Sequence, residues 1–228
     1  DERRAKAEAA RAEALAAAAT RARERSERRH AIASALGDAI SGELTGLGMG
    51  AARVLVELAP LDEAAAGELS VNGARLTAPG IDRAEFLIAP NRGEPARALR
   101  KIASGGELSR AMLAIKRVLS GLGPAGLYVF DEVDAGVGGA VAEVIGHKLV
   151  DVAAHAQVLC ITHLAQIAVH GDAHFRVSKR AEGERTYSEV RRLSDAERLE
   201  EVARMVGGIE VTRKTRAAAA EMLAGARR

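Results

Sequence analysis

Two short segments constrain what this chain can fold into more than any other part of it. The first has the sequence Ser-Gly-Gly-Glu at positions 104–107, at the start of a predicted helix. The second is an apolar run at 127–130 that predicts a buried strand and ends in Asp131 and Glu132. Adjacent glycines and the positively polarised start of a helix suit a phosphate group. Acids at the carboxyl end of a strand lie where open α/β sheets bind ligands. Together the two segments predict half of an ATP hydrolysis site.

Both segments also have a structural explanation that needs no ligand. Ser104 and Glu107 match a capping box, in which two side chains satisfy amides at a helix start. A strand end with exposed acids is an ordinary surface feature. Successive strand residues point to opposite faces of a sheet, so the two acids can have different functions. One can hold Mg²⁺ through its water shell, and the other can orient or deprotonate a water. A phosphate loop of the form G-x-x-x-x-G-K-[ST], which would complete the site, does not occur in the 228 residues.

Two further polar residues follow in an order that strengthens the prediction. Asp134 begins an Asp-Ala-Gly sequence, which is either an ordinary turn or a contact loop between subunits. His163 follows a largely apolar run at 158–162, and an imidazole at a sheet edge can contact a γ-phosphate, although a lone histidine is more often a surface residue. The order of these four features is hard to obtain by chance.

The first 47 residues predict a long helix. They are dense in Ala, Arg and Glu, contain no Pro, and have no Gly before Gly37. A stripe at spacing four, Ile32, Leu36, Ile40 and Leu44, could pack on another element. We expect an exposed arm that pairs with another helix. Contact of its charged run at 21–29 with DNA stays open, because such runs are usually solvated surface.

Composition narrows the function classes. Three Phe, two Tyr and no Trp leave a core of Ala, Leu, Val and Ile and make an aromatic base-stacking platform improbable. A net charge of +2 does not by itself indicate a nucleic-acid binder. The sole cysteine, Cys160, is expected to be a small buried apolar residue in a reducing compartment. We find no secretory signal or apolar run that could span a bilayer. Because the chain begins at Asp1 without Met, we expect a fragment or a processed chain.

The remaining pattern predicts an α/β fold. Strands are expected at 52–58 and 84–89, followed by a basic loop at 91–101 that is a plausible DNA-contacting patch through Arg92, Arg97, Arg100 and Lys101. A helix at 106–119, strand at 127–131, helix at 138–153 and strand at 157–161 predict a mainly parallel sheet that is buried on both faces. A hairpin at 174–193 and helices at 195–206 and 212–224 complete the chain. We expect two domains, a coiled-coil arm at 1–47 and a lobe at 48–228.

These residues together resemble the C-terminal lobe of an ATP-binding-cassette (ABC) ATPase head. The Ser-Gly-Gly-Glu segment is similar to the signature motif, the strand at 127–132 to the Walker B strand, Asp134 to the D-loop and His163 to the switch histidine. Glu after the two glycines is typical of SMC-like members that maintain chromosomes and repair DNA. The resemblance runs from about residue 45 to the end, and it narrows to the bacterial RecN family at 101–110, 131–137, 161–166 and 203–208. The first 47 residues resemble the returning strand of that family's coiled-coil arm.

The resemblance implies a role for each site residue, in two heads that enclose two ATP molecules. The signature loop of one head contacts, in trans, the γ-phosphate held by the phosphate loop of the other. Asp131 supports Mg²⁺, Glu132 is the catalytic base, and His163 contacts the γ-phosphate. The signature residues are Ser104, Gly105, Gly106 and Glu107, and the D-loop residue is Asp134. This chain departs from the family in having Gly138-Gly139 where a Ser-Gly pair is expected, which bears on the detail of the D-loop contact.

The implied function is repair of DNA double-strand breaks, in the bacterial cytoplasm at the nucleoid. The implied partners are the N-terminal phosphate-loop lobe of the same protein, a second copy joined through heads or arms, and DNA ends, with no membrane. ATPase activity is expected of the full-length protein and not of this chain alone. Two other functions stay open. The long charged helix argues against a subunit of a membrane transporter, and Asp131, Glu132 and His163 argue against a non-catalytic dimerisation module.

Overall fold

The computed structural model describes residues 1–65, 68–102, 104–123, 126–182, 185–208 and 210–226. The chain divides into two compact units. The first consists of residues 1–42 and 51–101, and the second of residues 43–50 and 102–228. Each unit is described by itself below. The expected division into an arm at 1–47 and a lobe at 48–228 stays a prediction.

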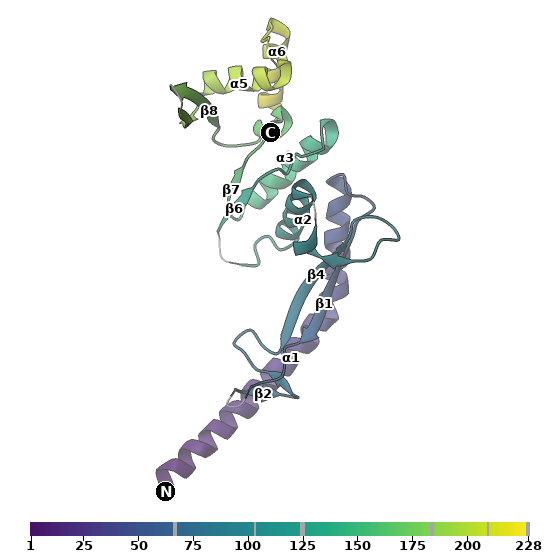
Figure 1. Cartoon of the computed structure of the whole chain (residues 1–228), viewed down its shortest axis with the longest axis vertical. Helices are drawn as coiled ribbons and strands as arrows, with labels where there is room; N and C mark the ends of the chain where they lie inside the picture. The colour runs from purple at the N-terminus through teal and green to yellow at the C-terminus, as the bar shows by residue number, and fades with distance from the viewer. Residues whose placement is uncertain (66–67, 103, 124–125, 183–184, 209, 227–228) are drawn as a thin grey trace. The chain divides into compact units, whose positions relative to one another are not determined.

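The N-terminal helix α1 spans Glu2–Gly46 and confirms the predicted long helix. Figure 1 draws it in purple as one continuous element. At the usual rise per residue it is about 70 Å long. Ile40 and Leu44 of the predicted apolar stripe are fully buried, whereas Ile32 is 59% exposed. Only the later turns of the stripe therefore pack against the protein.

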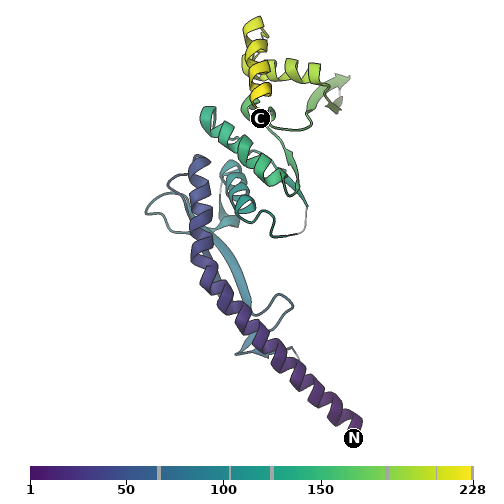
Figure 2. The same cartoon turned by 180° about the vertical axis from the view of Figure 1, so that it is seen from behind.

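The first unit contains a three-stranded antiparallel sheet, whose strands β1 and β4 lie along α1 in both views (Figures 1 and 2). β1 (Arg53–Pro60) pairs over its whole length with β4 (Asp82–Ala89), which also pairs with the short β5 (Arg97–Ala98). The 3-10 turn η1 (Leu99–Lys101) follows β5. The predicted strands at 52–58 and 84–89 are thus confirmed. The sequence pattern missed β5 and the two-residue strands β2 (Ser70–Val71) and β3 (Ala74–Arg75).

Small side chains hold α1 against the strands of its own unit. A Cβ atom on Gly37 would lie 2.7 Å from the carbonyl oxygen of Val54, so only glycine permits this approach. The Ser41 hydroxyl accepts a hydrogen bond from the Val54 amide at 2.9 Å and donates one to the Gly37 carbonyl at 2.8 Å. Nearer the N-terminus, Ala22 is buried in a cluster with Val71, Ala74 and Ile81. Part of the arm that was expected to be exposed therefore packs within its own chain.

The second unit is built on a β-α-β element. β6 (Leu127–Phe130), α3 (Gly139–Ala153) and β7 (Gln157–Cys160) follow one another, and the two strands pair in parallel. α2 (Gly105–Val118) precedes this element, and the short helix α4 (Ala165–Ala168) follows it. Both predicted strands and both predicted helices are confirmed. Because parallel strands end at the same edge, this connection brings the turn after β6 and the loop after β7, which carries His163, to one edge of the sheet.

The chain ends in a hairpin and two helices, as predicted. β8 (Phe175–Glu182) and β9 (Arg185–Arg192) form the hairpin, and α5 (Asp195–Gly207) and α6 (Arg213–Ala226) follow. The part of the predicted turn at 183–184 lies outside the described residues. The helices enclose a small apolar core, which is made of Ala165, Val169, Val202, Ala203 and Ala219.

One prediction about the parallel strands is wrong. Their apolar residues do not lie on two buried faces, because Leu127, Val129, Leu159 and Ile161 are 58%, 56%, 47% and 54% exposed. The α/β class and the long preceding helix are confirmed. Among the described residues, however, the only parallel pairing is that of β6 with β7, and the other strand pairs are antiparallel.

Candidate functional site

Ser104 is the N-cap of α2. Its hydroxyl accepts a hydrogen bond from the Glu107 amide at 3.4 Å. In the described part of the chain, a complete capping box is found at α5, between Ser194 and Glu197, and not at α2. Of the two hydrogen bonds of a capping box, one is therefore present between Ser104 and Glu107. Ser104 remains exposed at the start of α2, where first-turn amides have no partner within the helix.

Gly105 and Gly106 allow α2 to begin in contact with the turn that follows β6. A Cβ atom on Gly105 would lie 2.3 Å from Oε2 of Glu132. A Cβ atom on Gly106 would lie 2.8 Å from the Ala135 Cβ and 3.1 Å from the Glu132 carbonyl oxygen. The two segments that the sequence singled out are thus in contact within one chain. The Glu132 carboxylate lies directly beside the start of α2.

Glu132 has a backbone conformation that is rare for residues other than glycine. Its φ is +56°, and the residue is exposed. Such conformations cost roughly 1–3 kcal/mol and concentrate at functional sites, where the surrounding structure holds them in place. Here the Ala135 amide donates a hydrogen bond to the Glu132 carbonyl at 3.0 Å, which closes the turn. The turn directs the Glu132 side chain toward Gly105.

Asp131 lies at the carboxyl end of β6 and is exposed. The Ser109 hydroxyl donates a hydrogen bond to the backbone carbonyl of Asp131, which ties the strand end to α2 and leaves the carboxylate unused by this bond. Within the described residues, no group of three or more His, Cys, Asp and Glu side chains is placed to hold a metal ion. One accessible carboxylate still fits Mg²⁺, since that ion keeps several waters and takes few protein ligands.

Asp134 is buried and connects the turn after β6 to the loop after β7. Its Oδ2 accepts hydrogen bonds from the Thr162 hydroxyl at 2.6 Å and from the His163 amide at 3.0 Å. It also lies 3.0 Å from His163 Nδ1. The His163 side chain is 73% exposed, so the imidazole lies beside the buried carboxylate and stays accessible from outside.

Sequence reasoning gave no role to three residues that hold this arrangement. Ser109 binds Asp131, Thr162 binds Asp134, and Arg110 donates from Nη1 to the Ala135 carbonyl at 2.8 Å. Burial lowers the pKa of Arg110, and the nearby Glu107 carboxylate opposes that effect. Ser109 and Arg110 lie within one turn of Gly106 on α2, and Thr162 directly precedes His163. The sequence signal that could have identified these three residues is their position close to the predicted site residues.

Cys160 lies just before this edge and is partly buried. Burial raises the pKa of its thiol to about 12, and the carboxylates of Asp134 and Asp131 add to the rise. The expectation of a buried apolar residue therefore holds in part. The thiol is neutral near pH 7, and the acids around it make this edge of the sheet electronegative.

The second unit thus brings every predicted site residue to one region. The start of α2 carries the residues at 104–107, the turn after β6 carries Asp131, Glu132 and Asp134, and the loop after β7 carries His163. An electronegative edge beside a helix start can place a cation and a phosphate next to each other. The chemical role of each residue stays a prediction.

Proteins with closely similar sequences are described as DNA repair protein RecN. The relative from Treponema pallidum (strain Nichols) is 45% identical over 201 residues, which cover 88% of this chain and 34% of the relative. The relative from Streptomyces coelicolor is 41% identical over 213 residues, covering 93% of this chain and 36% of the relative. The relative from Bacillus subtilis (strain 168) is 48% identical over 155 residues, or 67% and 27%. The chain therefore spans about a third of the length of the relatives it matches.

Solved structures with partial likeness are SMC head domains. The head domain with a coiled coil and joint from Pyrococcus yayanosii has a TM-score of 0.48 and 20% identity, and the match covers 74% of this chain and 28% of that one. The head bound to the C-terminal domain of ScpA, from Pyrococcus furiosus, has a TM-score of 0.46 and 21% identity, with 77% and 38% covered. No family model matches the chain. None of the helices in its described part is both long and apolar enough to cross a membrane.

Proposed function

We propose that this chain, which is related over most of its length to the RecN DNA repair proteins, is one lobe of an SMC-like ATPase that repairs DNA double-strand breaks. One observation carries the proposal. The start of α2, the acids after β6 and the loop that holds His163 lie together in one unit of the protein. That combination fits a lobe that supplies acids and a histidine to one ATP and offers the start of α2 to the ATP of a second head, with the phosphate loops supplied by another segment.

Each residue then has a defined part in hydrolysis. Ser104 and the amides at Gly105 and Gly106 bind the γ-phosphate. Glu132 orients the attacking water and accepts its proton. Asp131 would hold Mg²⁺ through water molecules, and the bound ion would neutralise the charge that develops on the phosphates. His163 would contact the γ-phosphate through Nε2, since Asp134 lies 3.0 Å from the other ring nitrogen.

The signature loop is proposed to act on the ATP of a second head. Two copies would then enclose two nucleotides, and hydrolysis would depend on contact between the heads. Gly105 and Glu132 of one chain lie side by side. A phosphate of a second head that binds at the start of α2 would therefore also lie beside the turn that carries Glu132. Contact between the heads would in this way influence the position of Glu132.

The exposed face of the parallel strands is proposed to receive the phosphate-loop lobe. Leu127, Val129, Leu159 and Ile161 each lie about half exposed on or beside adjacent strands. Clustered apolar side chains of this kind mark contact surfaces. The relatives are about three times as long as the matched segment, so they contain ample sequence for such a lobe. A parallel β6–β7 pair also offers open strand edges for further strands.

The proposed contact surface is tested by supplying the phosphate-loop lobe. We expect ATP hydrolysis when this chain is co-expressed with the phosphate-loop segment of its full-length protein, and none from this chain alone. Leu159→Glu should prevent assembly and hydrolysis, because it places a charge on the covered face. Leu122→Glu is the matched control, since Leu122 is 78% exposed in the loop after α2. ATPase rate and co-purification are the measurements. Equal activity in the Leu159→Glu variant would contradict this surface assignment.

A further inference from the structure

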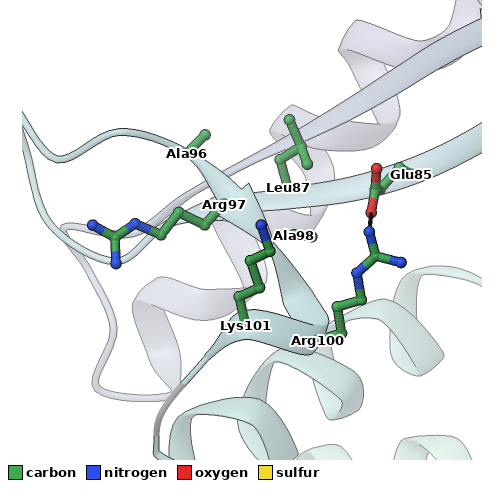
Figure 3. Close-up of a pocket in the computed structure, with 7 residues that line it drawn as sticks. All are labelled: Glu85, Leu87, Ala96, Arg97, Ala98, Arg100 and Lys101. Carbon is green, nitrogen blue, oxygen red and sulfur yellow. Dashed lines mark ion pairs between the residues drawn. The ribbon is translucent and has the colours of Figure 1, made fainter.

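A basic pocket lies in the first unit, where β5 and η1 meet β4 (Figure 3). Its volume is about 470 Å³, and it is open to solvent. Figure 3 shows the side chains of Arg97, Arg100 and Lys101 around it, with Glu85 paired to Arg100. The pocket belongs to one unit and is therefore formed without the residues of the ATPase site.

The charges of the pocket do not cancel. Three cationic side chains face a single carboxylate, that of Glu85, which leaves an excess of two positive charges. Arg100 Nη2 lies 3.2 Å from Glu85 Oε1, so this pair is satisfied. Arg97 and Lys101 are exposed, and neither has an ion-pair partner among the residues that the structure describes. They are available for an anionic ligand.

Several other arginines are paired with acids. In the β8–β9 hairpin, Arg191 faces Glu197. Arg176 of the same hairpin lies 3.6 Å from Glu201. On α1, Arg29 lies 3.3 Å from Asp82. The pocket combines a hollow shape with two cations that have no ion-pair partner in the described part of the chain, and this combination suits an anion.

The cations are held on regular structure. Arg97 lies on β5 in register with Ile88 of β4, and Lys101 ends the 3-10 turn that follows directly. Ala98 between them is buried and anchors the segment. The backbone that carries the two cations is thus ordered before binding, which limits the freedom lost on contact with phosphates.

The lining also limits the class of ligand. It combines the cations with the aliphatic side chains of Leu87, Ala96 and Ala98 and contains no aromatic ring. A nucleotide base is usually held by stacking on such a ring, so the pocket offers phosphate contacts without base recognition. Phosphate contacts alone position a protein on nucleic acid without reading its sequence.

We propose that this pocket binds backbone phosphates of duplex DNA, with Arg97 and Lys101 as the contacting residues. The inference deepens the proposed function by naming a DNA-contacting surface, and it rests on that function for the choice of duplex DNA. Binding is independent of sequence and weakens with salt, because each neutralised phosphate releases counterions.

The test is fluorescence anisotropy of the full 228-residue chain with a labelled blunt duplex over a range of salt concentrations. The double variant Arg97→Ala/Lys101→Ala should bind more weakly and should lower the slope of log affinity against log salt by roughly 2, about 0.9 for each phosphate contact. Arg213→Ala/Lys214→Ala, which removes two exposed cations on α6, is the control and should keep the wild-type slope. Circular dichroism confirms that each variant is folded.

A second experiment distinguishes duplex DNA from free nucleotide as the source of the bound phosphate. If ATP displaces the duplex from the wild-type chain and the double variant loses ATP binding, the pocket is a free-nucleotide site and the inference is overturned. An unchanged salt slope in the double variant, or no duplex binding by the wild type, also overturns it. Neither result affects the ATPase proposal, because hydrolysis by the restored head is measured separately and without DNA.

Discussion

Glu132→Gln in the protein with its phosphate-loop lobe restored should bind ATP normally and lose nearly all hydrolysis. The change removes the group proposed to accept the proton of the attacking water and keeps the size of the side chain. Loss of a general base typically costs 10²–10⁴-fold in rate, and we expect an effect of about this size in kcat. ATP binding is measured with a fluorescent analogue and turnover by phosphate release.

The matched control for that variant is Glu143→Gln. Glu143 lies on α3 and is exposed, so the same change of charge there should leave turnover unchanged. If Glu132→Gln hydrolyses ATP at the wild-type rate, Glu132 is not the base. Its unusual backbone conformation would then need a purely structural explanation.

The two glycines at the start of α2 should respond differently to alanine. Gly106→Ala places a Cβ atom 2.8 Å from the Ala135 Cβ and 3.1 Å from the Glu132 carbonyl oxygen, and neither a methyl group nor a main-chain oxygen can rotate away. We expect a loss of about 1–3 kcal/mol in the free energy of unfolding, as is typical of overpacking. In Gly105→Ala the close atom is the end of the exposed Glu132 side chain, which can rotate. Stability should therefore be kept, or gained by up to about 1 kcal/mol from helix propensity.

Urea unfolding and ATP turnover together test this difference. Gly105→Ala should fold normally yet hydrolyse ATP slowly in the restored head, since the added methyl displaces the Glu132 carboxylate. Gly225→Ala in α6 is the control, because a Cβ atom there meets nothing within 4 Å. Equal stability of the Gly105 and Gly106 variants would show that the described contact between α2 and the turn after β6 is not formed.

Much of the fold could be predicted from sequence because local signals were strong. The proline-free run before Gly37 predicted α1, and alternating apolar residues predicted β1 and β4. The succession of apolar strands and helices predicted the β6-α3-β7 element, in which two parallel strands end at the same edge. Elements of two residues, such as β5, carry no periodic signal and were missed.

The remaining features depend on contacts that sequence does not encode locally. The capping pattern suggested that Ser104 and Glu107 bind each other reciprocally, whereas the described structure contains one of the two bonds. Asp134 could be an ordinary turn residue on sequence grounds, and its burial beneath Thr162 and His163 follows only from the parallel pairing. The exposure of Leu127 was unpredictable for a related reason. Apolar strands are expected to be covered, and a sequence does not say whether another segment does the covering.

The central claim is that this lobe supplies one half of an ATP site shared between two heads. The direct test mixes two inactive variants of the restored protein, Ser104→Arg and Glu132→Gln. A mixed dimer contains one site with an intact Ser104 from one head and an intact Glu132 from the other. The account predicts that hydrolysis, absent from each variant alone, reappears on mixing. No recovery from mixtures that are shown to form mixed dimers would contradict it, because the two residues would then serve the same site from one chain.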